Sequence, residues 1–181
     1  MSFSANSNGG FPLYHTRKLR YFVQFLDKAA IIYNEDGSLR VTSELKSINY
    51  DSDEKRYGAI AVYLSTLFFW YFIAHSDCRN LNKREVDAFP FNLSDYEHIT
   101  YLSHLGKEII KNLQDNSTFL EATYKKYGKL SMQTFSPRLS KGIADNIDKL
   151  LANHYGFTDE ELDFIINYDV KYRMGEELNE E

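Results

Sequence analysis

The spacing of hydrophobic and polar residues changes along the chain, and these changes predict where strands and helices lie. Residues 19–26 are rich in aromatic and β-branched side chains, which favours a strand. Residues 30–33 and 39–42 flank the polar segment Asn34-Glu35-Asp36-Gly37. This pattern is typical of a hairpin, because Asp-Gly suits the positive φ of such a turn. Residues 44–50 form a weaker extended segment, so the first part of the chain predicts a small β-sheet.

The most apolar part of the chain is residues 54–76, which the pattern predicts as one long helix without an internal proline. Residues 59–74 carry no charge, but these 16 residues are fewer than the roughly 18 to 20 that span a bilayer. They also include polar side chains such as Tyr63, Ser65 and Tyr71. We therefore expect a helix that is buried on nearly all sides, and not a membrane span.

Further helices are predicted after a polar loop at residues 77–82 and a single helical turn at residues 83–88. Ser94-Asp95-Tyr96-Glu97 is a capping box that opens a helix to about Gln114. Its apolar stripe consists of Leu102, Leu105, Ile109 and Leu113. A mixed segment follows at 117–137. Ser140 can cap the next helix, which ends near Asn153. The capping box Thr158-Asp159-Glu160-Glu161 opens the last helix, which ends near Asn167.

These elements predict an α+β fold, with a small N-terminal β-sheet or hairpin followed by a buried aromatic helix and three further helices. We divide the chain into a flexible leader at residues 1–16, a sheet with the buried helix at 17–92, and a helical C-terminal part with an acidic tail at 93–181. No signal peptide is visible, because the first ten residues are polar. The single cysteine, Cys78, excludes a disulfide scaffold and fits a cytoplasmic location.

Charge is distributed unevenly along the chain. The formal charge of -5 excludes a globally basic nucleic-acid binder. Residues 157–181 hold nine acids and two bases, so the rest of the chain carries a net charge of +2. There the bases form three groups: Arg17, Lys18 and Arg20; Arg79, Lys83 and Arg84; and Lys125, Lys126, Lys129, Arg138 and Lys141. Each group alone is typical of a solvated surface. A DNA-binding role requires the fold to bring them to one concave rim, with the acidic tail pointing away.

The patterns of known catalytic sites are absent or weak. Gly9-Gly10 follows no strand, so no phosphate-binding loop is present. The prolines are isolated, whereas an amino-directed DNA methyltransferase needs Asn or Asp before Pro-Pro and an aromatic residue. A nuclease-like spacing of carboxylates and lysine occurs at Glu44-Leu45-Lys46 behind Asp36, at Asp53-Glu54-Lys55 and at Asp169-Val170-Lys171. Three occurrences in one charged chain show how unspecific this spacing is.

Metal and nucleophile chemistry has one candidate segment, His75-Ser76-Asp77-Cys78. It supplies two possible zinc ligands or a Cys/His pair, but a zinc site needs at least three protein ligands and no second cluster accompanies it. The end of a buried helix, with Cys78 as a small apolar side chain, is the favoured interpretation. We therefore assign no catalytic residue, no metal ligand and no cofactor-binding residue to this chain.

The segments 79–84 and 124–129 carry side chains suited to DNA. Arg can donate two hydrogen bonds to guanine, Asn can pair with adenine, and Lys or Arg can neutralise phosphates. Alternating aromatic and basic residues suit a nucleic-acid groove. An ordinary helix-terminating loop and an exposed strand explain the same segments, so the sequence leaves both interpretations open. The candidate DNA-binding residues are Arg79, Asn80, Asn82, Lys83, Arg84, Lys125, Lys126, Lys129, Arg138 and Lys141.

Two long strings of residues resemble a known protein family. The first is Leu64-Ser65-Thr66-Leu67-Phe68-Phe69-Trp70-Tyr71-Phe72, followed by Ser76-Asp77-Cys78-Arg79-Asn80-Leu81-Asn82-Lys83-Arg84-Glu85-Val86 and Phe89-Pro90. The second is Phe135-Ser136-Pro137-Arg138-Leu139-Ser140-Lys141, followed by residues 154–175. From about Arg17 to Gly175 the chain looks like the C-terminal target-recognition region, of the TaqI specificity type, of type IIG restriction-modification enzymes and adenine-N6 DNA methyltransferases.

The resemblance implies a bacterial DNA target-recognition module of a type II restriction-modification enzyme, whose partner is double-stranded DNA. It implies a fragment without its methyltransferase and nuclease domains, which is not an enzyme by itself. S-adenosylmethionine and Mg²⁺ would belong to those missing domains. The resemblance does not identify the side chains that read bases. In structural terms, Phe68 and Trp70 are expected in the core, and Asn82 is a possible cap of the following helical turn.

Two other functions stay open on the sequence. In the first, the chain is a helical protein-docking module whose aromatic helix and acidic tail pack on the catalytic domain, while DNA contact lies elsewhere in the parent enzyme. An exposed apolar patch larger than about 400 Å² would favour it. In the second, the chain is a membrane anchor, which requires residues 59–74 to face lipid.

Overall fold

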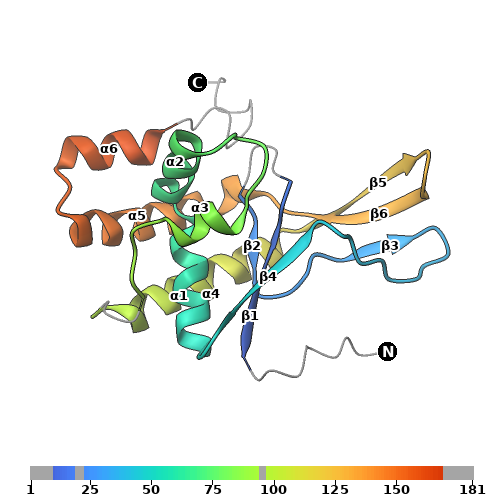
Figure 1. The fold of residues 1–181 in the computed structure, drawn as a ribbon, viewed down its shortest axis with the longest axis horizontal. Helices are drawn as coiled ribbons and strands as arrows, with labels where there is room; N and C mark the ends of the chain where they lie inside the picture. Colours follow the sequence, from blue (N-terminus) through green and yellow to red (C-terminus); the bar gives the residue numbers. More distant parts are fainter. Residues whose placement is uncertain (1–9, 19–22, 94–96, 169–181) are drawn as a thin grey trace.

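The computed structural model describes residues 10–18, 23–93 and 97–168, and its elements form two small antiparallel sheets beside a group of helices (Figure 1). In chain order these elements are β1 (Phe11–Thr16), β2 (Phe25–Leu26), β3 (Ile32–Asn34), β4 (Leu45–Tyr50), α1 (Asp53–Leu64), α2 (Thr66–His75), α3 (Lys83–Asp87), α4 (Ile99–Asp115), β5 (Thr118–Tyr124), β6 (Gly128–Thr134), η1 (Pro137–Ser140), α5 (Lys141–Tyr155) and α6 (Asp159–Asn167). The predicted α+β class is confirmed.

The first sheet has the order β2-β1-β4, with β1 in the centre. β1 pairs with β4 from Phe11↔Tyr50 to Thr16↔Leu45. The side chains of Leu13 and His15 are buried on the face toward the helices, because alternate residues of a strand point to one side. The predicted leader at 1–16 is therefore too long: residues 11–16 form the central strand, while residues 1–9 lie outside the described part.

The predicted hairpin around Gly37 is present, although its second half is not a strand. Asn34 accepts a hydrogen bond from the Gly37 amide at 2.9 Å, and Gly37 has a φ of 78°. Residues 39–42 contribute only a bridge between Leu39 and Tyr33. The extended segment predicted at 44–50 is β4. Of the strand predicted at 19–26, residues 25–26 form β2 and residues 19–22 lie outside the described part.

The long helix predicted at residues 54–76 is wrong in one respect, because it is two helices bent by 64° at Ser65. Ser65 has extended backbone angles, and its Oγ donates to Val62 O at 2.6 Å and accepts from the Phe68 amide at 3.0 Å. The buried Asp148 of α5 accepts from the next two amides, Thr66 N at 3.1 Å and Leu67 N at 3.0 Å. A negative carboxylate at these unpaired amides stabilises a new helix N-terminus.

The core lies between α1, α2, α4, α5 and the inner face of the first sheet. Phe68 is fully buried, with its ring edge-on to those of Phe25 and Phe89, while Trp70 is partly buried against the same core. The predicted apolar stripe of α4 is buried, with Leu102 fully enclosed. Gly106 of α4 lies against the Tyr57 carbonyl of α1, where an added Cβ would be only 2.0 Å away. The two helix backbones can approach closely there because position 106 has no side chain.

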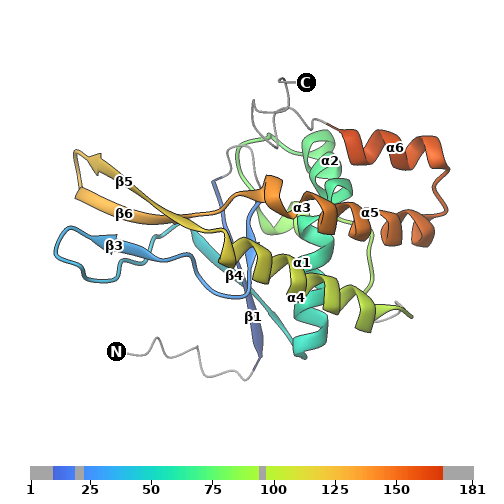
Figure 2. The same ribbon diagram turned by 180° about the vertical axis from the view of Figure 1, so that it is seen from behind.

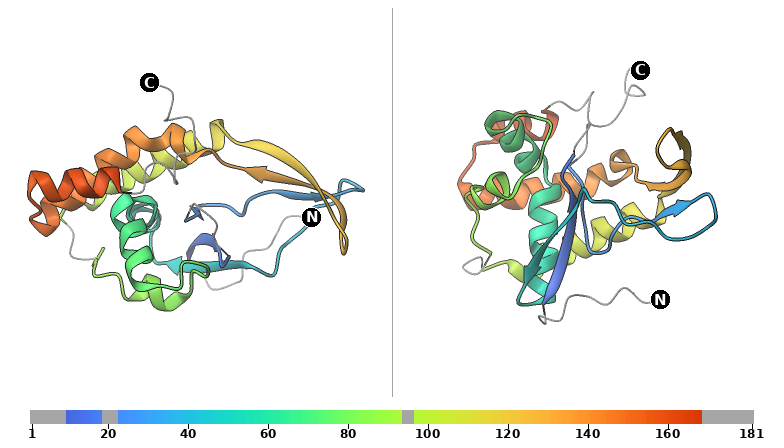
Figure 3. Two further views of the ribbon diagram at one scale, coloured as in Figure 1. Left: turned by 90° about the horizontal axis from the view of Figure 1, so that it is seen from above. Right: turned by 45° about the vertical axis from the view of Figure 1, so that its right-hand side comes forward.

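The part predicted as helical also contains the β5–β6 hairpin, which joins β3 in a second sheet of order β3-β6-β5. This second sheet, here called the arm, extends away from the helices (Figures 2 and 3). The capping box at 158–161 is confirmed. The predicted start at Ser94 is wrong, because α4 begins at Ile99 with His98 at its N-cap, and residues 94–96 lie outside the described part. Ser140 is at the N-cap of α5, but its hydroxyl donates to Asn112.

In the described ranges, no single helix has both the length and the apolar composition to cross a membrane. Only α1 and α2 taken together reach that length, across the bend at Ser65.

Candidate nucleic-acid interface

The loop between α2 and α3 is fixed against the end of β1. The Leu81 amide donates to the Arg17 carbonyl at 2.8 Å, and Asn80 forms an antiparallel bridge with Lys18. The Leu81 side chain is fully buried in the core and anchors the loop there. These contacts bring together two basic groups that are about sixty residues apart in sequence, with the exception of Arg20, which lies outside the described residues.

Five cations from these two groups are exposed. They are defined here as the basic face: Arg17, Lys18, Arg79, Lys83 and Arg84. Three of them have acidic partners: Lys18 is 3.8 Å from Glu44, Lys83 pairs with Asp87, and Arg84 is 2.9 Å from Glu85. Ion pairs on an exposed surface contribute little, so Lys18 and Lys83 can exchange their partners for phosphate oxygens, whereas Arg84 is paired with a buried carboxylate.

The loop itself is ordered by Asp77. Its carboxylate accepts hydrogen bonds from the Arg79 amide at 2.9 Å, the Asn80 amide at 2.8 Å and the Asn80 side-chain amide at 2.8 Å. These bonds, that of the Asn80 side chain foremost, lower the pKa of Asp77 to about 2. Cys78, which lies between Asp77 and Arg79 in the chain, has a φ of 57°. This is in the left-handed region that non-glycine residues rarely adopt.

Both predicted base-reading amides are engaged inside the loop. The Asn80 side chain donates to Asp77, and the Asn82 side chain donates to the Asn80 carbonyl at 3.4 Å. Asn82 is the N-cap residue of α3, and its backbone amide donates to Glu85 Oε2 at 2.9 Å. The expectation that Asn82 caps the following helical turn is confirmed. Asn80 and Asn82 therefore shape the loop, and the cations are its outward groups.

Glu85 is the buried partner of this charged segment. Its side chain is only 2% exposed, whereas that of Arg84 is 80% exposed. Burial raises the pKa of the Glu85 carboxyl, but the hydrogen bonds from Arg84 and from the Asn82 amide outweigh it and leave the pKa below its usual value. Glu85 therefore stays ionised and anchors both α3 and the Arg84 guanidinium.

The third basic group does not join the basic face. Lys125 and Lys126 lie in the β5–β6 turn, at the tip of the arm and away from α3 (Figure 1). Lys129 of β6 pairs with Glu121 at 2.8 Å, and Lys141 pairs with Asp145 at 2.7 Å at the start of α5. Arg138 is exposed on η1. The expectation that all three groups share one rim is wrong, because β5 and β6 form a projecting hairpin that carries Lys125, Lys126 and Lys129 away. The acidic residues 169–181 lie outside the described part.

The tip of the arm contains a cation that the sequence did not single out. The Arg40 guanidinium stacks over the Tyr127 ring at 3.8 Å, and Lys126 Nζ lies 5.2 Å from the same ring. Tyr124 and Tyr127 are 41% and 44% exposed. Arg40 reaches this place because β3 pairs with β6, from Ile32↔Met132 to Asn34↔Leu130. Pairing over about a hundred residues leaves no local signal in the sequence.

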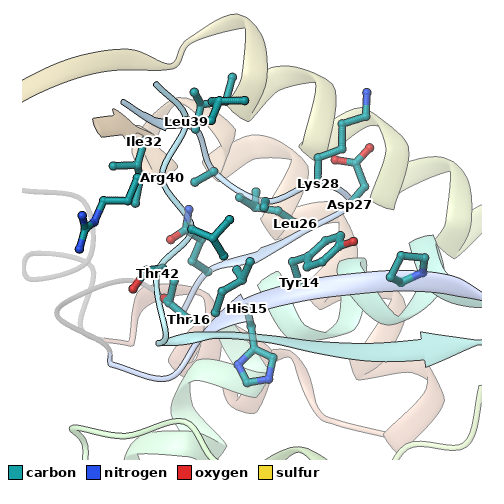
Figure 4. Close-up of a pocket in the computed structure, with 17 residues that line it drawn as sticks. Tyr14, His15, Thr16, Leu26, Asp27, Lys28, Ile32, Leu39, Arg40 and Thr42 are labelled. Carbon is teal, nitrogen blue, oxygen red and sulfur yellow. The ribbon is translucent and has the colours of Figure 1, made fainter. Parts of the chain in front are cut away.

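An apolar pocket of about 420 Å³ lies between the outer face of the first sheet and the β3 hairpin (Figure 4). Its lining includes Leu26, Ile32 and Leu39. The register of the arm places Ile32 beside Met132 and Met132 beside Leu120, so apolar side chains continue from the pocket to the outer strand. Leu120 and Leu39 are 55% and 53% exposed. We call Ile32, Met132, Leu120 and this pocket the apolar strip.

The segments weighed for catalysis make other contacts. His75 Nδ1 hydrogen-bonds to the Tyr71 carbonyl at 2.9 Å, and Cys78 is exposed. Arg56 pairs with Asp53, and Lys55 pairs with Asp51. Within the described ranges, no three His, Cys, Asp or Glu side chains come together as a possible metal site. The sequence pattern at 169–171 lies outside those ranges.

Comparison of the chain with protein-family models, curated proteins and solved structures gives no match.

Proposed function

We propose that the chain is a DNA target-recognition module of a type II restriction-modification enzyme, and that it contacts duplex DNA through the basic face. The observation that carries the proposal is the fixed contact of the α2–α3 loop with the end of β1. It brings two distant segments that carry exposed cations side by side. The resemblance of the loop and of the C-terminal segment to the family gives the proposal its enzyme class.

The chemistry of the basic face suits the phosphate backbone. Exposed Lys and Arg release condensed counterions when they neutralise phosphates, which makes binding strong at low salt and weak at high salt. The amides that suit base edges are used inside the loop, so the cations are the groups of this face that are left to contact DNA, and their contacts with phosphate position the module on the duplex. Modest affinity is expected of the chain alone, because the proposed methyltransferase domain would hold the rest of the duplex.

The first test is a fluorescence anisotropy titration of the full chain with duplex DNA at several salt concentrations. We expect Lys83→Ala to reduce the slope of log K against log salt by about 0.9, because one phosphate contact is lost. The control is Lys111→Ala, which removes an exposed, ion-paired lysine of α4 away from the basic face. Affinity that does not change with salt, or an equal effect of both variants, would contradict the proposal.

A second function, docking on the parent enzyme, is favoured by the apolar strip. The structure modifies this alternative, because the aromatic helices α1 and α2 are buried in the chain's own core. Several of the exposed apolar side chains, Phe119 and Leu120 among them, lie on the arm instead. Association with the proposed methyltransferase domain would bury them. The two functions are compatible, since the apolar strip and the basic face are formed by different residues.

Docking is tested with the separately produced methyltransferase domain of the parent enzyme by isothermal titration calorimetry. We expect Leu120→Glu to weaken association at least tenfold, which corresponds to about 1.4 kcal/mol, and to leave DNA affinity unchanged. Phe164→Glu is the matched control, because Phe164 is an equally exposed apolar residue on α6. If Leu120→Glu binds the domain as tightly as the unmodified chain, the apolar strip is not the docking surface.

A further inference from the structure

An acidic side chain lies beside the basic face. Asp77 precedes Arg79 by two residues, and a negative charge beside a DNA-binding surface repels phosphate. If only its charge mattered, Asp77 would therefore weaken DNA binding. Its hydrogen bonds show that the carboxylate also orders the loop.

Asp77 fixes the backbone on the N-terminal side of the loop. One oxygen, Oδ1, accepts from the amides of both Arg79 and Asn80, and the other, Oδ2, accepts from the Asn80 side chain. The amide of Cys78 donates to Ser76 Oγ at 3.0 Å. These bonds hold Cys78 at its positive φ, a conformation that needs compensation from its surroundings.

Leu81 fixes the loop on the other side. Its side chain is fully buried and its amide donates to the Arg17 carbonyl. The chain is thus held immediately before and after Arg79, whose side chain is exposed between the two fixed points. A guanidinium on an ordered backbone loses less conformational entropy on binding than one on a loose loop.

We propose that Asp77 is a positioning residue, which orders the loop so that the Arg79 guanidinium contacts a DNA phosphate. The inference rests on the proposed function and adds the residue through which one of its contacts is organised. A guanidinium presents paired N–H donors that match phosphate oxygens, so its orientation affects the strength of the contact. Asp77 acts through Arg79 and does not itself touch DNA.

The sign of one substitution distinguishes positioning from simple charge. Removing an acid from the basic face strengthens DNA binding if only charge matters. We expect Asp77→Ala to weaken binding to duplex DNA by about threefold to tenfold. Without the Asp77 hydrogen bonds, the loop that carries Arg79 loses conformational entropy when it binds. The matched control is Asp87→Ala, which removes the exposed acid that pairs with Lys83 and should bind DNA as tightly as the unmodified chain or more tightly.

A double-mutant cycle with Arg79→Ala shows whether Asp77 acts through Arg79. We expect Asp77→Ala to cause no further weakening in the Arg79→Ala background, because the contact it organises is already absent. Circular dichroism melting checks that each variant is folded. If Asp77→Ala does not fold, Asp77→Asn replaces it, since the amide oxygen retains an acceptor for the loop amides, and a smaller loss of affinity is expected.

The outcomes separate this inference from the proposed function. If the unmodified chain binds DNA and Asp77→Ala, or Asp77→Asn in its place, binds as tightly or more tightly, the positioning role is overturned and the proposed function stands. The same holds if the loss of affinity is equal with and without Arg79. If the unmodified chain does not bind duplex DNA at low salt, both are overturned.

Discussion

His15 is a histidine whose protonation opposes folding. Its side chain is 5% exposed on the inner face of β1, beside the Phe25 ring. Burial, with a smaller contribution from the Lys46 ammonium, lowers the pKa of His15 below 6.5. The folded protein therefore holds a neutral imidazole where the unfolded chain takes up a proton, and the stability that depends on this neutral form is present above pH 6.5 and lost as the pH falls below it.

We expect the free energy of unfolding to decrease from pH 7.5 to pH 5.5, by at most about 1.4 kcal/mol for each pH unit below 6.5. His15→Gln should remove this part of the pH dependence, because glutamine does not titrate. Urea unfolding at the two pH values measures it, with His104→Gln, an exposed residue of α4, as the control. An unchanged pH dependence in His15→Gln would show that His15 does not cause it.

Between elements, the bend at Ser65 depends on a residue far away in sequence. The apolar pattern correctly predicted that residues 54–76 are helical, but it did not predict the break at Ser65. The break becomes stable when Asp148 of α5 meets the amides of Thr66 and Leu67. A contact across about eighty residues cannot be found from local periodicity.

We expect Asp148→Ala to destabilise the protein by about 2 to 5 kcal/mol, because it leaves two buried amides without acceptors. Asp145→Ala on the same helix is the control, since Asp145 pairs with Lys141 in a less buried position and should cost less than about 1 kcal/mol. Thermal and urea unfolding give both values. A loss for Asp148→Ala no larger than that for Asp145→Ala would mean that the carboxylate is not needed at the bend.

Helix packing gives a matched pair of glycine substitutions. A Cβ at Gly106 would lie 2.0 Å from the Tyr57 carbonyl, whereas a Cβ at Gly142 meets nothing within 4 Å. We expect Gly106→Ala to destabilise the protein by about 3 kcal/mol, because the backbones of α1 and α4 must separate. Gly142→Ala should stabilise it by up to about 1 kcal/mol through helix propensity. Equal effects in urea unfolding would contradict the close packing.

At the scale of the whole molecule, the sequence predicted the α+β class, the turn at Gly37 and the capping box at Thr158. These features depend on local patterns. The place of β3 in the arm was missed because β3 and β6 pair across about a hundred residues. The local β5–β6 hairpin lay in a segment of mixed pattern that the sequence analysis left unassigned. The lysines around Lys125 are separated in space from the basic face because the β5–β6 hairpin projects from the helices.

The candidate site was predicted only in part. The exposed cations Arg79, Lys83 and Arg84 were chosen from their chemistry, and the structure adds Arg17 and Lys18 beside them. Asp77 was missed as an organising residue, because its role is visible only in the hydrogen bonds of the folded loop. The sequence signal that could have indicated it is an Asp at the start of a polar turn, where an Asp side chain commonly accepts the amide two residues further on.

The salt dependence of DNA binding tests most directly whether two distant basic groups form one DNA-binding face. We expect Arg17→Ala and Arg79→Ala each to reduce the slope of log K against log salt by about 0.9, and the double variant to reduce it by about twice as much. If Arg17→Ala leaves the slope unchanged while Arg79→Ala reduces it, the end of β1 does not share the interface. That result would contradict the basic face as defined by this fold.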